Sequence, residues 1–250
     1  MSRSLSRALS ILELFSTEEA EWGITEISQE LDLPKSTVHG LIKTLENHQF
    51  IEATEHNRYR LGIKLYELGL TYQGTAKLSI IAEPLIKMLA LKYQQSVHIA
   101  IYAGKMAVFI IGNKSGTSQI IFPRIGTGIA AYCTGVGKVL LAFQSENYIN
   151  EYLQTEKLIS YTKNTIIDKK ALKEELINIK EQGYAIDREE AVMGIGCVAA
   201  PIFSFSRDIM AAISVSGTVE KILAEDRLAT CVFDVRNAAK SISESLGYKA

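Results

Sequence analysis

Lys35, Ser36 and Thr37 directly follow Pro34, at a point where the sequence predicts that a helix begins. Backbone N–H groups and hydroxyls in the first turn of a helix bind phosphate oxygens, and the helix dipole favours negative charge there. Lysine adds an attraction to phosphate that does not depend on base sequence, whereas Ser36, Thr37 and His39 can reach base edges. These residue types at this spacing predict contacts with nucleic acid.

The segment around these residues is expected to form two short helices and a tight turn, after a first helix. Apolar residues recur every three or four positions from Arg3 to about Ser16, which predicts that first helix. Thr25 is expected to cap the second helix, and Leu33-Pro34 ends it because a residue before proline avoids helical geometry. The third helix has a buried stripe of Val38, Leu41, Ile42 and Leu45. This is the plan of a helix-turn-helix.

Two short strands are predicted after the third helix. They cover residues 50–53 and 58–61, and the polar residues 54–57 form the turn between them. A hairpin in this place is the wing of a winged helix domain, and it carries Arg58 and Arg60. Together with Lys35 and Lys43 they provide four cations for phosphate contacts. The competing interpretation is a winged helix that binds protein, with Ser36 serving only as an N-cap.

The charge balance places a demand on the nucleic-acid interpretation. The whole chain has a formal net charge of −1, and residues 1–75 carry seven Lys and Arg against eleven Asp and Glu, which is a net charge of −4. The cations must therefore cluster on one face.

The three cysteines are far apart and never form a C-x-x-C pair, which argues against a disulfide framework and fits a reducing cytoplasm. Neither a signal peptide nor a membrane span is expected.

The remaining sequence predicts a mixed domain in which an antiparallel sheet is flanked by helices. A hairpin is expected around Gly104-Lys105, and strands are expected near 184–186, 197–203 and 210–216. Asp168 is predicted to cap a helix that ends at Gly183. Further helices are predicted over 79–93, 134–143 and from about Leu228 to Leu246. The chain as a whole is expected to be an α+β protein.

Catalysis is the main rival class of function. Gly137-Lys138 looks like part of a phosphate loop, but the loop pattern requires glycine at Tyr132 and Ser or Thr at Val139. Cys197 and His98 are a conceivable nucleophile and base, yet no third group that would orient the base is evident. A metal site built from His98, Cys197 and Asp187 has no ligand spacing to mark it. We therefore expect neither an enzyme nor a bound metal or cofactor.

Three N-terminal motifs resemble the IclR family of transcription regulators. They are Leu33-Pro34-Lys35-Ser36-Thr37-Val38-His39, Tyr59-Arg60-Leu61-Gly62 and Leu68-Gly69. The resemblance implies that Lys35, Ser36, Thr37 and His39 lie at the DNA-facing start of the recognition helix, with Arg58 and Arg60 on the wing. Gly40 is a departure, since the family commonly has arginine there, and glycine costs a helix about 1 kcal/mol relative to alanine.

The resemblance continues through the second half of the chain. It is carried by residues 134–142, 183–190, 196–203 and 211–217, in the order typical of the IclR effector domain. The family fold implied here is a GAF-like domain, a curved antiparallel sheet with helices on its faces. In such regulators the ligand is commonly a small organic acid or an aromatic acid.

Carried over position by position, the resemblance implies a set of effector-binding residues. The polar part of the site is formed by Gly135, Val136, Asp187, Cys197, Ser214 and Ser216, and the apolar walls by Ile121, Ile129 and Ile195. Free N–H groups at a helix start suit a carboxylate, and Ser214 and Ser216, two apart on a strand, point the same way. The alternatives are a surface pair of Asp187 with Arg188 or Arg207, a merely buried Cys197 and two ordinary strand serines.

Three regions follow from these patterns. Residues 1–62 are expected to be the winged helix-turn-helix, 63–77 a linker helix and 78–250 the GAF-like effector domain. We expect a cytoplasmic homodimer or homotetramer on a palindromic operator in double-stranded DNA. The family habit favours repression relieved by the ligand, although activators also occur.

Overall fold

A computed structural model describes residues 2–16, 19–71, 75–113 and 123–249. The chain divides into two compact units, Met1–Ala76 and Lys77–Ala250, which are described separately. The segment predicted as a linker, 63–77, contains helix α4 (Ile63–Thr71) and the start of helix α5 (Thr75–Tyr93). No helix within the described ranges is both long and apolar enough to cross a membrane.

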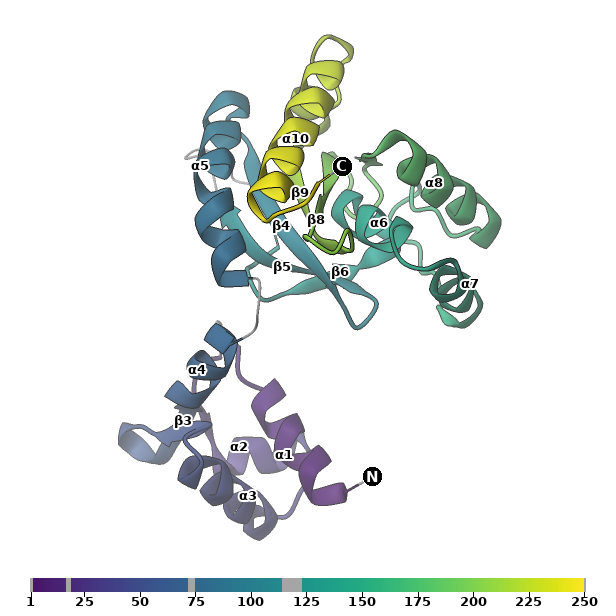
Figure 1. Cartoon of the computed structure of the whole chain (residues 1–250). Coiled ribbons are helices and arrows are strands. Elements are labelled where there is room, and N and C mark those ends of the chain that lie inside the picture. Colours follow the sequence, from purple (N-terminus) through teal and green to yellow (C-terminus); the bar gives the residue numbers. More distant parts are fainter. Residues whose placement is uncertain (1, 17–18, 72–74, 114–122, 250) are drawn as a thin grey trace. The chain divides into compact units, whose positions relative to one another are not determined.

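The first unit contains helices α1 to α4 (Figure 1) and a three-stranded antiparallel sheet in the order β1-β3-β2. Its core consists of Ile11, Ile27, Val38, Ile42 and Ile51. The elements before α4 are α1 (Arg3–Glu13), β1 (Trp22–Gly23), α2 (Ile24–Glu30), α3 (Lys35–Asn47), β2 (Ile51–Ala53) and β3 (Arg58–Leu61). The predicted helix-turn-helix and its wing hairpin are thus confirmed.

Local details of this unit differ from the sequence predictions. Helix α2 begins one residue before Thr25 and has Gly23 as its N-cap, so the predicted cap was wrong. The Glu26 carboxylate accepts the Gly23 N–H at 2.8 Å, which replaces the capping hydroxyl. Helix α1 ends at Glu13 rather than near Ser16. Strand β1 was not predicted, because two residues give no periodicity to read.

The second unit is built on a six-stranded, fully antiparallel sheet in the order β6-β5-β4-β9-β8-β7. Its strands are β4 (Ser96–Ala103), β5 (Met106–Asn113), β6 (Gly128–Ala130), β7 (Ala185–Arg188), β8 (Ile195–Phe203) and β9 (Ile209–Thr218). Beyond α5, its helices are α6 (Gly135–Ala142), α7 (Glu146–Thr155), α8 (Lys169–Gln182), α9 (Val219–Ile222) and α10 (Glu225–Ser245). This is the predicted α+β plan, with α7, α9 and β6 as additions.

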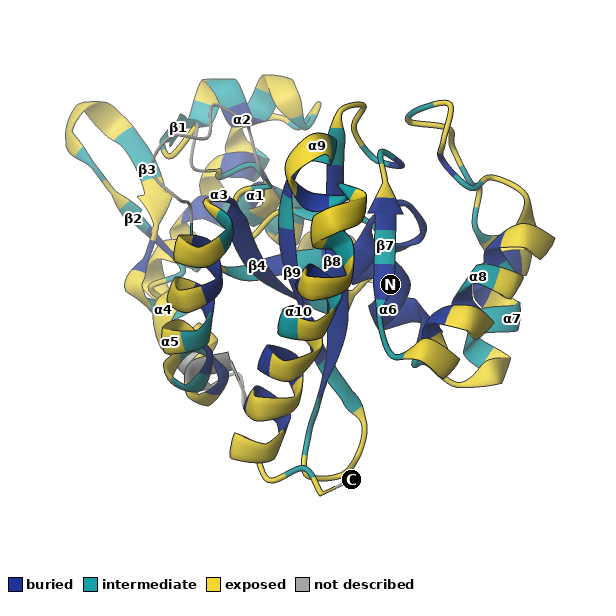
Figure 2. Cartoon of the chain, turned by 90° about the horizontal axis from the view of Figure 1, so that it is seen from above, coloured by how far each residue is buried: buried dark blue, intermediate teal, exposed yellow. Residues whose placement is uncertain are grey.

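The two faces of this sheet are covered by different helices (Figures 1 and 2). Helices α5, α9 and α10 share a core with large sheet residues such as Val198 and Ile213. Helices α6, α7 and α8 share a second core, to which the sheet contributes the alanines Ala100, Ala107, Ala199 and Ala212. Neighbouring residues of a strand point to opposite faces, so this alternation lets α6 lie close to the backbone of the sheet.

Gly40 generates a prediction about stability. It lies inside α3, and a Cβ added there meets no atom within 4 Å. We expect Gly40→Ala to raise the free energy of unfolding by about 1 kcal/mol, because alanine loses less backbone entropy in a helix. Urea denaturation of both proteins measures the difference.

Gly62→Ala is the matched control for that experiment. A Cβ at Gly62 would lie 2.2 Å from the backbone oxygen of Gln49, so this variant should be destabilised. An equal effect of the two substitutions would contradict the steric argument.

Candidate nucleic-acid interface and ligand cavity

Helix α3 presents its polar residues on the side opposite its buried stripe. Val38 and Ile42 are buried, whereas Lys35, Ser36, His39 and Lys43 are exposed and Thr37 is partly exposed. Pro34 is the N-cap and makes no side-chain capping bond, so Ser36 is not the N-cap. The Thr37 and Val38 N–H groups donate to the Pro34 carbonyl oxygen at 2.9 and 3.1 Å, so those of Lys35 and Ser36 are the ones left without an acceptor in the helix.

The cations of the predicted interface fall into two groups. The wing residue Arg58 binds both carboxylate oxygens of Glu26, at 2.9 and 2.8 Å, and the Glu21 carbonyl oxygen at 2.7 Å. Its guanidinium holds the pKa of Glu26 below the usual range. Arg60 pairs with Glu52 at 2.5 Å. Arg58 therefore fastens strand β3 to α2, and each wing arginine faces a carboxylate.

Lys35 and Lys43 are different, because no ion pair joins them to an acidic residue in the part of the chain that the structure describes. The sequence between them, from Lys35 to Lys43, contains no acidic residue. Glu21, Glu26 and Glu52 are turned toward the wing arginines instead. These three carboxylates of the unit are thus engaged at the wing and not by the lysines of α3.

A second candidate site is a cavity of about 80 Å³ between the sheet, the start of α6 and the segment that joins β7 to β8. Seven of the nine predicted effector residues line it, namely Ile129, Val136, Asp187, Ile195, Cys197, Ser214 and Ser216. Gly135 lies just outside, where a Cβ would approach the Cys197 sulfur to 2.5 Å. Ile121 is outside the described residues. The cavity also contacts residues that were not predicted, namely His98, Phe109, Pro123, Thr134, Ala191 and Val192.

Sheet register brings the polar side chains of the cavity together. Asp187 of β7 is directly opposite Cys197 of β8, which is directly opposite Ser216 of β9. Directly opposed residues share a face of the sheet, so these three side chains form a row. The hydroxyl oxygens of Ser214 and Ser216 are 3.5 Å apart. His98 is opposite Ser214, a relation that only the register of β4 with β9 reveals.

The start of α6 closes one side of the cavity. Thr134 caps this helix by accepting the Gly137 N–H at 3.1 Å. The Gly135 N–H interacts with the Cys197 sulfur. The N–H that remains for a ligand among the predicted pair is therefore that of Val136, which lines the cavity.

Burial decides the protonation of the acidic groups in this cavity. It raises the pKa of Asp187 to about 7, against the opposing effect of the Glu190 N–H, which donates to Asp187 Oδ1 at 2.8 Å. Asp187 is buried here, not paired with Arg188 or Arg207 at the surface. Burial also raises the pKa of the Cys197 thiol, so it is neutral at physiological pH and is not an activated nucleophile. Within the described ranges, no cluster of three or more His, Cys, Asp or Glu residues could hold a metal ion.

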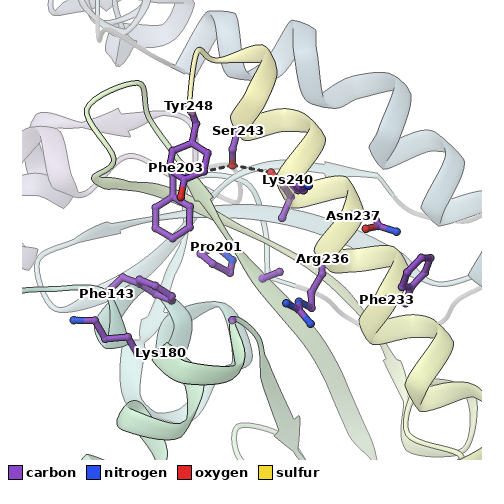
Figure 3. Close-up of a pocket in the computed structure, with 13 residues that line it drawn as sticks. Phe143, Lys180, Pro201, Phe203, Phe233, Arg236, Asn237, Lys240, Ser243 and Tyr248 are labelled. Carbon is purple, nitrogen blue, oxygen red and sulfur yellow. Dashed lines mark hydrogen bonds between the residues drawn. The ribbon is translucent and has the colours of Figure 1, made fainter. Parts of the chain in front are cut away.

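A wider groove of about 660 Å³ lies at the edge of the sheet and contains none of the predicted residues (Figure 3). Its walls come from α8, α10, β8 and Phe143. Phe203 stacks on Tyr248 with ring centroids 5.2 Å apart. The Phe203 N–H donates to the Ser243 hydroxyl oxygen, and Pro201 has no N–H, so two potential donors of this strand edge are unavailable to another strand.

Comparisons with known proteins agree on one family. The sequence model of the IclR helix-turn-helix domain matches residues 4–55, and that of the bacterial transcriptional regulator IclR C-terminal domain matches residues 71–244. The chain is 34% identical to the HTH-type transcriptional regulator XynR of Escherichia coli K12, over 99% of this chain and 98% of XynR.

Two further proteins extend this comparison. The HTH-type transcriptional repressor AllR of Escherichia coli K12 is 30% identical, over 100% of this chain and 92% of AllR. The crystal structure of an IclR homologue from Microbacterium hydrocarbonoxydans, complexed with 4-hydroxybenzoate, has the same fold with a TM-score of 0.87. It is 22% identical, and the alignment covers 97% of this chain and 98% of that one.

The raised pKa of Asp187 predicts how stability depends on pH. An unfolded Asp has a pKa of about 3.9, so between about pH 4 and 7 the folded chain binds more protons than the unfolded chain. The stability contributed by Asp187 therefore falls as the pH rises from about 4 to 7. Asp187→Asn stays neutral and can still accept the Glu190 N–H. We expect the free energy of unfolding of Asp187→Asn to exceed that of the wild type by about 2–4 kcal/mol at pH 8 and by much less at pH 5.

Urea unfolding at several pH values measures this difference. Glu190, Glu189, Lys138, Cys133 and Cys197 all act electrostatically on Asp187 or respond to it, and they are present in both proteins. A stability difference that does not change with pH would rule out the titration of Asp187 in this range.

Proposed function

The chain belongs to the IclR family of transcription regulators, and on this basis we propose that α3 reads a palindromic operator while the buried cavity receives a small organic-acid effector. Its relatives XynR and AllR are DNA-binding regulators, and AllR is a repressor. The protein is accordingly a regulator and not an enzyme. A regulator of transcription works where the chromosome is, so we propose a cytoplasmic location.

For DNA binding, we propose different roles for the exposed residues of α3 and for the wing. Ser36, Thr37 and His39 contact base edges, and Lys35 and Lys43 contact phosphates. Arg60 adds a weaker phosphate contact because Glu52 already binds it. Arg58 positions the wing through Glu26, and because its guanidinium is already paired its predicted phosphate contact is also a weaker one. The absence of acidic residues between Lys35 and Lys43 supports this assignment.

A homodimer or homotetramer would place two copies of α3 on the two halves of the operator. Leu5 and Leu9 of α1 are 60% and 50% exposed, and Ile63 and Tyr66 of α4 are 55% and 65% exposed. Apolar side chains on the surface of a small unit favour association, and two copies of one chain bring the same faces together. We propose that α1 and α4 supply this contact.

The effector proposal is carried by the row of Asp187, Cys197 and Ser216, of which the first two are buried, in a cavity whose other walls are mostly apolar. A few fixed polar groups among apolar walls are typical of small-molecule sites. The Val136 N–H and the serine hydroxyls suit a carboxylate. The cavity is smaller than the roughly 300–1,000 Å³ of many ligand pockets, which favours a compact acid. The 4-hydroxybenzoate in the Microbacterium homologue is a small aromatic acid, which supports this ligand class.

The proposed mechanism is a shift between two arrangements of the subunits. An effector that binds one arrangement more tightly populates it and thereby changes the distance between the recognition helices. By analogy with the repressor AllR, we propose that the effector lowers operator affinity.

Substitutions of the two lysines test the DNA interface. Lys35→Ala and Lys43→Ala should each weaken binding to duplex DNA and lower the slope of log K against log salt by about 0.9, because each removes one phosphate contact. Fluorescence anisotropy at several salt concentrations measures the slope. Lys87→Ala, in α5, is the control and should behave as the wild type. Unchanged slopes for both α3 variants would disprove the assigned phosphate contacts.

A thermal-shift screen tests the effector site. We expect at least one acid among keto acids, sugar acids and aromatic acids to raise the melting temperature with concentration, because it binds only the folded state. Asp187→Ala should lose this shift and keep its affinity for DNA, whereas the exposed control Asp208→Ala should keep both. Loss of DNA binding along with the ligand response in Asp187→Ala would contradict the division of labour between the two units.

A further inference from the structure

Lys138 is a fully buried lysine in the middle of α6, with 1% of its surface exposed. Its ammonium donates to Glu190 Oε1 at 2.5 Å, Glu175 Oε1 at 3.0 Å and the Ile186 carbonyl oxygen at 3.0 Å. Burial by itself favours the neutral amine, but Glu190 and Glu175 outweigh it and raise the pKa of Lys138. The charged group is therefore retained inside the protein, with an acceptor for each of its three N–H bonds.

Glu190 connects this ammonium to the cavity. Its side chain is held by Lys138, and its own backbone N–H donates to Asp187 Oδ1 at 2.8 Å. Its carbonyl oxygen accepts the Thr165 hydroxyl at 2.6 Å. Glu190 itself is only 4% exposed. Glu190 thus accepts hydrogen bonds from α6 and from the segment before α8, and it donates one to Asp187.

The segment that contains Glu190 forms part of the cavity wall. Ala191 and Val192 follow it directly, and Ile195 begins the next strand; all three line the cavity. Glu189 and Gly194 at the two ends of the turn have positive φ angles of 65° and 79°. The Glu189 carboxylate accepts the Gly194 N–H at 2.7 Å and closes the turn. The Lys138–Glu190 bond ties this turn to α6, and Ala191 of the turn packs against the core to which α6 contributes.

We propose that Lys138 and Glu190 are positioning residues of the effector site: Lys138 anchors the turn through Glu190, and the Glu190 N–H directs the Asp187 carboxyl group into the cavity. Neither residue lines the cavity, so their effect on the effector is indirect. The inference rests on the proposed effector role of the cavity. Its main consequence, however, concerns Asp187 in the empty protein and is measurable without any ligand.

Burial raises the pKa of Asp187 most, and the charges of this network modify it further. Glu190 and Glu189 raise its pKa and Lys138 lowers it, in addition to the larger effect of burial. Glu190→Gln can still accept a hydrogen bond from Lys138 and still offers its N–H to Asp187, so its geometry is conserved while one negative charge is lost. The pKa of Asp187 should therefore fall in this variant.

The test is an NMR pH titration of the backbone amide of residue 190, whose N–H is bonded to the Asp187 carboxylate. In the wild type we expect a midpoint near pH 7, and in Glu190→Gln a midpoint lower by about one unit. Glu175→Gln is the matched control. Glu175 contacts the same ammonium from α8 but does not belong to the turn and makes no hydrogen bond to Asp187, so in Glu175→Gln the midpoint of the residue 190 amide should stay near that of the wild type.

Two results would overturn the proposal. One is an unchanged midpoint in Glu190→Gln, and the other is an equal shift in Glu175→Gln. Lys138→Gln is the more obvious substitution, but it leaves Glu190 buried without a counter-charge and can prevent folding. The two glutamine variants keep the lysine and avoid this problem.

Binding measurements separate this inference from the proposed function. With glyoxylate, pyruvate and 4-hydroxybenzoate as probes, an acid that stabilises the wild type should bind Glu190→Gln about fivefold more weakly at pH 7, because the neutral fraction of Asp187 falls by that factor and ionised Asp187 repels the carboxylate of the acid. The affinity should recover at pH 5.5. If no acid binds the wild type but the NMR midpoints move as expected, the effector role fails while the effect of Glu190 on Asp187 stands. Equal affinities of the wild type and Glu190→Gln for the acid at pH 7 would refute the effect of Glu190 on the effector site.

Discussion

The close approach of α6 to the sheet is the constraint on which the second unit depends. All eight residues of this helix are buried, and the sheet faces it with alanine side chains. A Cβ at Gly135 would lie 2.5 Å from the sulfur of Cys197 on β8, so only glycine permits this distance. Because α6 packs so close to the sheet, its first turn lies next to the row of Asp187, Cys197 and Ser216, and Lys138 is buried.

The parts of the fold that depend on neighbouring residues were predictable from the sequence. Asp168 caps α8 by accepting the Ala171 N–H, and Gly183 ends that helix with a left-handed φ of 76°. The Gly104-Lys105 turn joins β4 to β5, and both of its residues have positive φ angles. These elements are local, and their sequence patterns are correspondingly clear. By contrast, β1 and β6 are too short for a pattern, and each exists because a longer strand is available to pair with it.

The candidate sites depend on contacts between distant residues, which the sequence shows less directly. Family resemblance placed Ser214 and Asp187 near a ligand, and both line the cavity. Lys138 was considered only as part of a phosphate loop, although its role follows from Glu190, 52 residues away. Arg58 was expected to face DNA because it lies on the wing, and its bond to Glu26 depends on how β3 packs against α2. Charge type was readable from the sequence, but charge pairing was not.

The pairing of the wing arginines also affects how the protein distributes over a chromosome. Contacts with phosphate alone are the same at every site, and a genome presents about 10⁶–10⁹ sites that compete with the operator. When Arg58 and Arg60 are occupied by Glu26 and Glu52, the protein gains less from bulk DNA. A larger share of its affinity then depends on base edges, so fewer molecules are sequestered on unrelated sequence. In the proposed binding mode, the negative charge of this unit thus favours discrimination between sites over affinity for DNA as such.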